Sequence, residues 1–351
     1  MEILDHAKYS EYESFVQGHV NGGITQSVLW HNVKHNWGRE IVVSRDESGK
    51  IIGAVSVLIR KMPVLGVAML YSPRGPVCDH HDKAVMADLK AGIDILAKKY
   101  RAYVYKMDPD INVNDEEFAK LARDMGFLQI KGGTGFETIQ ARFNYRLYTE
   151  GRSEEELFKN LTQKTRYNVR VALKHNVEIK VVGNEYLDEF MRIMSLTGER
   201  DGFNIRSKAY FKCMLESLGE YARLYMAFYE GKAVSGAITT NYAGKTCYIY
   251  GASDNAHRNV MPNYLIQWEM IKWAVEKNCT VYDFQGVSGN FDDESDHLYG
   301  LYRFKKGFNG TVDELAGEFD YIYRPVSAKL VDMSIDLNEK LSGFKRKLAK
   351  R

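Results

Sequence analysis

One order of strands and a helix occurs twice along this 351-residue chain and restricts the folds open to it. The first copy has two strands around a turn, a third strand, a helix and a fourth strand, expected at residues 41–43, 51–58, 67–71, 84–97 and 102–107. The second copy repeats this order at residues 222–229, 234–240, 246–250, 262–276 and 280–284. Strands and helices in this order form layered structures, so two copies of one α/β unit are predicted.

Short stretches of sequence recur with the elements. Gly49–Ala54 reads Gly-Lys-Ile-Ile-Gly-Ala, and Gly231–Ala237 reads Gly-Lys-Ala-Val-Ser-Gly-Ala. The order of elements resembles the GCN5-related N-acetyltransferase fold, doubled. The predicted fold class is therefore α/β (α+β), a tandem pair of GCN5-related N-acetyltransferase-like domains with mixed sheets. Residues 1–150 and 151–325 are expected to form the domains, with C-terminal residues able to complete the first, and residues 326–351 a basic C-terminal helix.

The composition indicates a folded protein without a large electrostatic field. Aromatic residues are abundant, with 23 Tyr, 16 Phe and 4 Trp, and the formal charge is only +2. Contact with nucleic acid or membrane must therefore depend on local basic patches. The N-terminus lacks the basic and apolar regions of a signal peptide, and the early apolar run Val64–Leu70 is too short to span a bilayer. A cytoplasmic location is expected.

The spacing of cysteine and histidine gives little support for a metal site. The four cysteines lie far apart without a Cys-x-x-Cys pair, which argues against a disulfide framework and a zinc ribbon. His31 and His35 have the spacing of a helical metal pair, but no carboxylate follows the first and no third ligand is evident. No metal is predicted.

Cations and aromatic residues are concentrated in Tyr299–Gly310, which has four aromatic residues, three cations and three glycines. A cation beside apolar rings is poorly hydrated and acts strongly on nearby charge. Lys305, next to Phe304, is therefore a candidate to hold an oxyanion. The alternative is a basic strand edge or loop without a catalytic role.

Two other basic regions admit both a structural and a binding interpretation. Arg166, Arg170 and Lys174 share one face of a helical segment expected over residues 153–175. That face is either a solvated stripe or a phosphate-binding surface. The basic tail at residues 345–351 is either a frayed end or a contact for anionic lipid or RNA.

Four motifs occur in order, Lys164–Ala172, Tyr248–Ser253, Tyr282–Gly286 and Leu301–Phe308. With them the chain resembles, over nearly its whole length, the Fem family (FemA, FemB, FemX) of peptidoglycan-bridge peptidyltransferases. The resemblance implies transfer of an amino acid from aminoacyl-tRNA to the stem-peptide amine of lipid II or UDP-MurNAc-pentapeptide, with no metal or organic cofactor. The chain resembles the compact branch without a helical arm, and a monomer is expected. Peripheral contact with the inner face of the membrane is left open.

The resemblance also implies site residues, matched by position. The implied acceptor contacts are Lys34, Trp37, Tyr103, Arg206, Tyr210 and Tyr250. The implied residues of the transfer centre are Lys305, Phe304 and Asp108. Arg206 and Tyr210 match the pair that grips the acceptor's diphosphate. With a tRNA donor, the helical face of Arg166, Arg170 and Lys174 is the candidate tRNA contact.

The chemistry of aminolysis assigns roles to these residues. An aminoacyl ester needs a neutral amine nucleophile, a place for its proton and a partner for the tetrahedral oxyanion. Lys305 is the expected oxyanion partner. Asp108, or less favourably Asp110, is expected to orient the amine, because an ordinary exposed aspartate is a poor base unless burial raises its pKa. Alignment of an already activated ester is expected to supply much of the rate.

Three alternatives are kept beside this interpretation. An acetyl-CoA-dependent acetyltransferase usually needs an Arg/Gln-x-x-Gly-x-Gly/Ala turn before a helix, and neither Arg258–Asn263 nor Arg74–Asp79 matches it. An N-acyltransferase acting on another cell-envelope or polysaccharide precursor is excluded less well. A non-enzymatic RNA-binding protein would have no need of the aromatic-flanked Lys305.

Overall fold

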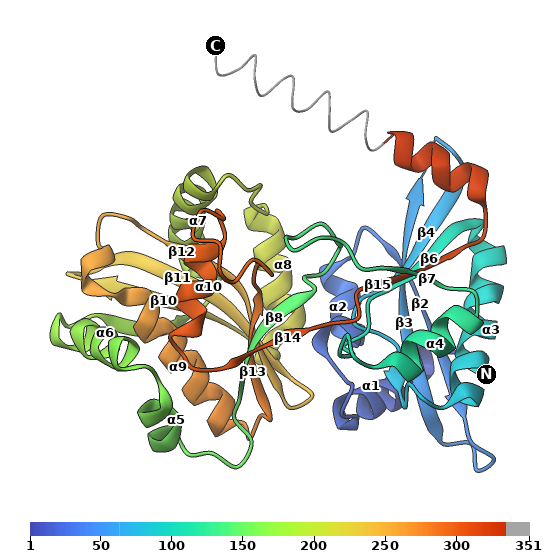
Figure 1. Ribbon diagram of the computed structural model, residues 1–351, viewed down its shortest axis with the longest axis horizontal. Coiled ribbons are helices and arrows are strands. Elements are labelled where there is room, and N and C mark those ends of the chain that lie inside the picture. The colour runs from blue at the N-terminus through green and yellow to red at the C-terminus, as the bar shows by residue number, and fades with distance from the viewer. Residues whose placement is uncertain (63, 335–351) are drawn as a thin grey trace.

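The computed structural model describes residues 1–62 and 64–334 and contains two mixed β-sheets with helices packed against them (Figure 1). The strands of the first sheet are β1 (Glu2–Ile3), β2 (Gly38–Arg45), β3 (Ile51–Met62), β4 (Val67–Ser72), β5 (Val77–Cys78), β6 (Ala102–Met107), β7 (Leu128–Ile130) and β15 (Glu318–Ile322). They lie in the order β1-β2-β3-β4-β6-β15-β7, with β5 paired to β3. The helices of this half are α1 (Tyr9–Gly18), α2 (Val28–Val33), α3 (Lys83–Tyr100) and α4 (Glu116–Asp124).

The second sheet has seven strands. These are β8 (Phe143–Tyr148), β9 (Glu178–Val182), β10 (Ala222–Tyr229), β11 (Lys232–Tyr242), β12 (Lys245–Ser253), β13 (Val281–Gly286) and β14 (Thr311–Glu314). Their order is β14-β8-β13-β12-β11-β10-β9. The helices of this half are α5 (Glu154–Asn160), α6 (Gln163–Lys174), α7 (Leu187–Asp201), α8 (Lys208–Leu218), α9 (Pro262–Glu276) and α10 (Tyr299–Lys306).

The two sheets share one plan, which confirms the predicted duplication. In each, three consecutive antiparallel strands are followed by a helix and a parallel strand: β2, β3, β4, α3 and β6 in the first, and β10, β11, β12, α9 and β13 in the second. Helix α3 begins where Asp82 accepts hydrogen bonds from the first-turn amides and buries a stripe that includes Leu89, Ile93 and Leu96. Apolar periodicity therefore sufficed to place the repeated elements.

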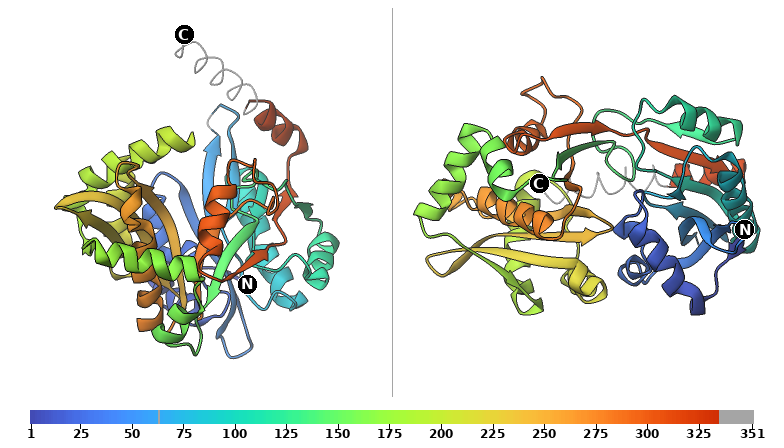
Figure 2. Two further views of the ribbon diagram at one scale, coloured as in Figure 1. Left: turned by 60° about the vertical axis from the view of Figure 1, so that its left-hand side comes forward. Right: turned by 90° about the horizontal axis from the view of Figure 1, so that it is seen from below.

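The two halves exchange one strand each. Strand β8 follows β7 in the chain but inserts between β13 and β14 of the second sheet, with Asp283 opposite Arg146. Strand β15 follows β14 but inserts between β6 and β7 of the first sheet, with Phe319 opposite Met107. Figure 2 shows the red C-terminal strand crossing from one half to the other. Strand β8, which lies within residues 1–150, thus pairs in the second sheet, and the first sheet contains a strand from residues 318–322.

The parallel strand pairs of the two sheets differ. In the first sheet β4 and β6 stay paired from Ala68 to Ser72. In the second sheet β12 and β13 pair only at Lys245 to Cys247, after which β12 continues along β11 and β13 continues toward β8. Backbone groups beyond this point lose their partners across the pair, so the second sheet opens where the first stays closed.

An apolar core joins the halves. One cluster of buried side chains includes Val33 of α2, Tyr71 of β4, Phe211 of α8 and Ile238 of β11. Helices α2 and α8 pack directly against each other. Because the core includes both sheets, the two halves form one packed body and not separate domains on a linker.

Two expected segments differ in detail. The single helix expected over residues 153–175 is two helices, α5 and α6, because Leu161 is extended (ψ 150°) and Thr162 caps α6 by accepting from the Thr165 amide. Residues 299–310, for which a strand edge or loop was the alternative prediction, are mostly helix α10, which ends at Lys306.

The C-terminal segment is helical over residues 325–334, and Val331 is buried in the core that joins the halves. The basic stretch at residues 345–351 lies outside the described residues. In the described part of the chain, no helix combines the length and apolar character needed to cross a bilayer.

Candidate functional site

Two cations and two tyrosines meet where α2 packs against α8. Lys34 Nζ lies 3.4 Å from Tyr210 Oη and 5.2 Å from the centre of that ring. Arg206 Cζ lies 5.3 Å from the same ring, and Tyr250 donates a 3.5 Å hydrogen bond to Tyr210 Oη. Ser207 caps α8 by accepting from the Tyr210 amide, which fixes the first turn that presents the phenol. Four of the six implied acceptor residues are therefore brought together.

The positive charge of this cluster is not neutralised. Within residues 1–62 and 64–334, neither Lys34 nor Arg206 has a carboxylate partner. Burial, with a smaller contribution from the like charge of Arg206, lowers the pKa of Lys34 to about 8. An anion bound between the two cations would reverse that effect, so the cluster has the electrostatics of an anion site.

The other two implied acceptor residues lie in the same apolar core but do not bond to the cluster. Tyr103, on β6, is buried, and its carbonyl accepts hydrogen bonds from the amides of Tyr323 and Arg324. Trp37 is partly buried, with Arg60 Cζ 5.7 Å from its ring centre. Tyr103 lies on β6, the strand that Asp108 follows, and an acceptor contact of Tyr103 or Trp37 stays a prediction.

Asp108 follows β6 and is almost fully buried, at 3% exposure. Its carboxylate accepts a 2.6 Å hydrogen bond from Tyr71 Oη and a 2.7 Å hydrogen bond from the Arg74 amide. Burial outweighs these contacts and raises the pKa of Asp108 to about 6. The condition under which this aspartate could receive a proton near neutral pH is therefore met.

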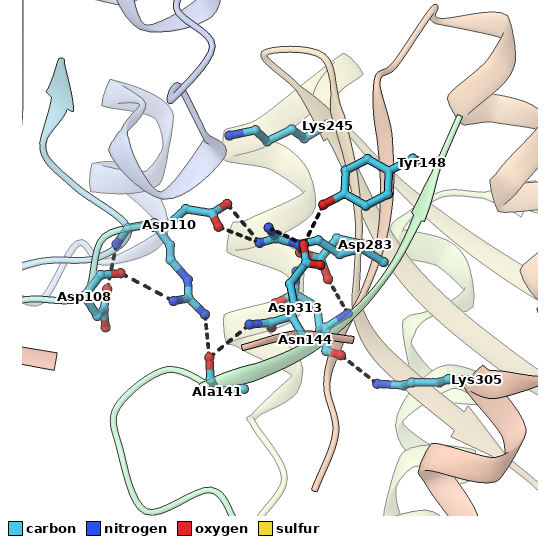
Figure 3. A network of polar contacts seen from close by, with 12 residues as sticks. Asp108, Asp110, Ala141, Asn144, Tyr148, Lys245, Asp283, Lys305 and Asp313 are labelled. Carbon is cyan, nitrogen blue, oxygen red and sulfur yellow. Dashed lines mark hydrogen bonds and ion pairs between the residues drawn. The ribbon is translucent and has the colours of Figure 1, made fainter. Parts of the chain in front are cut away.

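A three-way ion pair lies between the halves. Arg146, on β8, lies 2.8 Å from Asp110, 3.0 Å from Asp283 and 3.2 Å from Asp313. Figure 3 shows the three carboxylates gathered around one guanidinium. The guanidinium holds the pKa of Asp110 well below its usual range, despite burial. Asp110 is therefore a structural anion, and only Asp108 keeps the properties expected of an amine partner.

Lys305 is buried, at 3% exposure, on the inner face of α10. Its Nζ donates to the carbonyls of Gly286 (2.7 Å) and Gln285 (3.2 Å), at the end of β13. Burial lowers the pKa of Lys305 to about 7, opposed by the charge of Asp283. With two carbonyl partners an ammonium keeps one N–H for a further acceptor, so Lys305 could donate to an oxyanion beside the opened end of the second sheet.

Phe304 precedes Lys305 on α10 and packs in an aromatic cluster. Its ring centre lies 5.0 Å from that of Tyr264 and 5.6 Å from that of Phe308. Phe308 belongs to the core of the second half, and Phe304 and Tyr264 pack against that core. Lys305 itself is buried, and this burial is the physical cause of its lowered pKa.

Lys305 and Asp108 do not touch. Neither makes a hydrogen bond or ion pair with the other, and Figure 3 shows them at opposite ends of the polar network, Asp108 at the left and Lys305 at the lower right. The structure therefore presents two chemical groups on opposite sides of the junction between the halves. Sequence matching named both residues but gave no indication of this separation.

The basic face of α6 is partly used for packing. Arg166 donates to the Lys159 carbonyl (2.6 Å) and to the Leu161 carbonyl, which ties α6 to the end of α5. Arg170 lies over the Phe158 ring, with Cζ 5.5 Å from its centre. Both roles are structural, while Lys174 is exposed at the end of the helix. A tRNA contact on this face stays a prediction.

The histidine and cysteine side chains occupy structural positions. His31 Nε2 lies 2.6 Å from Ser56 Oγ, and burial lowers the pKa of the ring to about 3. The four cysteines are free thiols, two of them buried. In the part of the chain that the structure describes, no three potential metal ligands converge.

Sequence reasoning missed Tyr71 and Arg74, which donate to Asp108, and the ion pair of Arg146 with Asp283. One signal was available. Asp283 interrupts the apolar run Val281–Phe284, and a charge inside a buried strand requires a partner. The partner itself could not be found, because Arg146 belongs to a strand assigned to the other half.

Comparison with known proteins places this geometry in context. The chain matches the FemAB family over residues 8–243 and 229–334. It is 30% identical over 420 residues to a lipid II:glycine glycyltransferase of Staphylococcus saprophyticus subsp. saprophyticus, covering 100% of this chain and 99% of that protein. The corresponding protein of Staphylococcus haemolyticus is 29% identical over 413 residues, covering 95% and 98%. These alignments are longer than the chain, so the relatives contain residues that it lacks.

Solved structures give the same result as the sequence comparisons. A crystal structure of FemX superposes with a TM-score of 0.86 at 26% identity, covering 94% of this chain and 100% of that one. A tandem GNAT protein from the clavulanic acid biosynthesis pathway superposes with a TM-score of 0.55 at 11% identity, covering 91% and 97%. The second likeness concerns the fold alone, and it confirms the predicted tandem acetyltransferase-like architecture.

Proposed function

Because this chain belongs to the FemAB family and is an aminoacyltransferase, we propose that it transfers an amino acid from aminoacyl-tRNA to the stem-peptide amine of a peptidoglycan precursor, lipid II or UDP-MurNAc-pentapeptide. The product would be an interpeptide bridge or its first residue. The relatives named above are lipid II:glycine glycyltransferases, which supports a lipid-linked acceptor. The proposal includes a monomer in the cytoplasm, with contact at the inner face of the membrane when the acceptor carries lipid.

The observation that carries the proposal is the pair of cations, Lys34 and Arg206, that both lie within 5.3 Å of the centre of the Tyr210 ring and have no carboxylate partner in the described residues. Both candidate acceptors carry a diphosphate, and a guanidinium and an ammonium can share its oxygens. Because Lys34 comes from the first half and Arg206 from the second, the bound diphosphate would fix the acceptor across the junction. The amine of the stem peptide would then be aligned by binding energy from a remote part of the substrate.

The reaction follows from the two groups on either side of that junction. Asp108, ionised at neutral pH, would accept a hydrogen bond from the attacking amine and orient it. The amine attacks the ester carbonyl, and the negative charge that develops on its oxygen would be stabilised by protonated Lys305. Collapse of the tetrahedral intermediate expels the ribose hydroxyl of the tRNA and leaves an amide. The proton lost by the amine reaches that hydroxyl, with Asp108 as its first available acceptor.

Arg206→Ala is expected to weaken acceptor binding while leaving the fold unchanged. The substitution removes a guanidinium that can pair with two phosphate oxygens, which corresponds to a loss of roughly tenfold or more in affinity. Titration with UDP-MurNAc-pentapeptide measures the effect. Lys208→Ala is the matched control, because Lys208 pairs with Asp188 at 2.6 Å on the surface. Equal affinities for both variants would exclude Arg206 from the acceptor site.

The donor is tested by its sensitivity to ribonuclease and salt. Purified protein is incubated with a panel of charged tRNAs and with either precursor, and the product is identified by mass. A tRNA held through backbone phosphates is released as salt rises, so transfer should fall with ionic strength and stop after ribonuclease treatment. Acetyl-CoA should give no product. Acetylated product from ribonuclease-treated protein would overturn the proposed donor.

A further inference from the structure

The carboxylate Asp108 and the amine Lys305 belong to different halves. One side chain, Arg146, contacts the segment that carries Asp108 and the strand whose end holds Lys305. Arg146 contacts Asp110, two residues after Asp108, through Nη2 at 2.8 Å. It contacts Asp283 of β13 through Nε at 3.0 Å. The same guanidinium therefore holds the loop after β6 and the strand that ends at the carbonyl partners of Lys305.

The link continues into the backbone of β13. Asp283 uses its other oxygen, Oδ1, to accept a 2.6 Å hydrogen bond from the Gln285 amide. Gln285 has φ +64°, a conformation that costs energy for a residue with a side chain and that a fixed acceptor can maintain. In this conformation the carbonyls of Gln285 and Gly286 both face Lys305. The pairing of β13 with β8 shifts register at this point, as at a β-bulge.

A second contact connects the surroundings of Asp108 to the residues that lead into β8. The Arg74 side chain donates a 2.8 Å hydrogen bond to the Ala141 carbonyl, just before β8, while its amide binds Asp108. Asn144 of β8 also donates to Ala141, at 3.1 Å, and stands opposite Gly286 in the sheet. Figure 3 shows this second route below the first. Strand β8 is thus the common support of both chemical groups.

We infer that Arg146 is a positioning residue for the transfer reaction, which sets the place of Asp108 relative to Lys305 by clasping Asp110 and Asp283 across the junction between the halves. Arginine suits this role because its planar guanidinium can meet several carboxylates in fixed directions, which the single ammonium of lysine cannot. Asp313, its third partner, lies on β14 and carries neither group. Asp313 is therefore outside the link, although it contacts the same guanidinium.

This difference gives a matched experiment on the full chain. Asp110 and Asp313 have side-chain exposures of 19% and 18%, and each contributes one negative charge beside Arg146. Asp110→Ala breaks the link to the Asp108 loop, whereas Asp313→Ala leaves it intact. Both variants keep two carboxylates at Arg146. Asp313→Ala also removes the acceptor of the Tyr148 hydroxyl (2.6 Å), so its melting temperature should fall at least as far as that of Asp110→Ala.

The kinetic experiment measures the turnover number at saturating substrates. It depends on the proposed function because that function determines which substrates are used. A small displacement of a reacting group lowers turnover by about tenfold to a hundredfold, so that loss is expected in Asp110→Ala with an acceptor KM close to that of the parent. Asp313→Ala should stay within about twofold of the parent. Asp110→Asn, which keeps an oxygen for the guanidinium, should recover part of the loss. Equal turnover in both alanine variants would overturn the inference.

A substrate-free measurement separates this inference from the proposed function. Hydrogen exchange is followed in the peptide that covers residues 104–114. Loss of the clasp should speed exchange at Asp108 and Asp110 by about tenfold in Arg146→Lys relative to Asp313→Ala. Within the same peptide the Val113 amide donates to the Glu314 carbonyl (2.9 Å), so its exchange should stay slow in both variants. Identical exchange in these variants contradicts the positioning role, whatever substrates the parent protein accepts, whereas an inactive parent with the expected exchange pattern contradicts only the proposed function.

Discussion

Lys305→Met is expected to lower transfer by roughly a hundredfold or more without loss of the fold. Methionine keeps an unbranched stem of similar length but removes the positive charge that α10 places at the end of β13. The carbonyls of Gln285 and Gly286 lose their donor, while the cost of burying an amine disappears, so these two effects on stability oppose each other. Single-turnover rates with a charged tRNA and precursor, together with melting curves, measure both consequences.

The control for this variant is its neighbour. Lys306→Met removes an exposed lysine that lies over the Tyr302 ring, and turnover should stay close to that of the parent. The pH dependence gives a second readout, because burial lowers the pKa of Lys305 to about 7. The protonated fraction falls as pH rises through that value, whereas an arginine stays charged. The rate of the parent relative to Lys305→Arg should therefore fall with rising pH. A Lys305→Met turnover within a few-fold of the parent would leave the lysine a structural role only.

Arg146→Met should destabilise the protein by about 3–5 kcal/mol, because it leaves three partly buried carboxylates without their shared cation. Denaturant unfolding at neutral pH measures this loss. Arg192→Met is the control, since that arginine is half exposed beside Glu189 and should contribute less than about 1 kcal/mol. Equal losses for the two variants would contradict a buried clasp.

The loss in Arg146→Met should also depend on pH, with a sign that can be worked out. In the parent the guanidinium holds the pKa of Asp110 below its unfolded value, so its stabilisation is present above the unfolded pKa and disappears as pH falls through the folded one. Without the guanidinium, burial raises the pKa of the same carboxyl above its unfolded value. The variant should therefore regain stability relative to the parent as pH falls from 7 toward about 5.

The repeated elements were predictable because each is encoded locally. Helix α9 was expected at residues 262–276 and spans Pro262–Glu276, since its apolar spacing and its first-turn proline are properties of one segment. Strand β8 also has a local signal, the alternation of buried and less buried residues, but its own residues do not determine which sheet it joins. The alternation of Phe143, Tyr145 and Leu147 states which face is buried and not which strands lie beside it.

For the candidate site, individual residues could be named from the sequence, but their surroundings could not. Lys34, Arg206, Tyr210 and Tyr250 were named from sequence motifs, and the structure brings them together. The raised pKa of Asp108 could not be foreseen, because it results from burial in the folded protein and not from any neighbour in the chain. The clasp at Arg146 was hidden for a related reason, since its partners come from three separate parts of the sequence.

The exchanged strands constrain how the chain can be completed during synthesis. When the first seven strands of the first sheet have been synthesised, the place between β6 and β7 is still empty, because Glu318–Ile322, which occupies it in the folded protein, has not yet been made. The N-terminal half therefore cannot finish ahead of the C-terminal half, although domains usually fold in the order of their synthesis. Until nearly the whole chain has emerged, β6 exposes an unpaired edge that is open to wrong partners. The nascent protein depends on its last strand to close its first sheet.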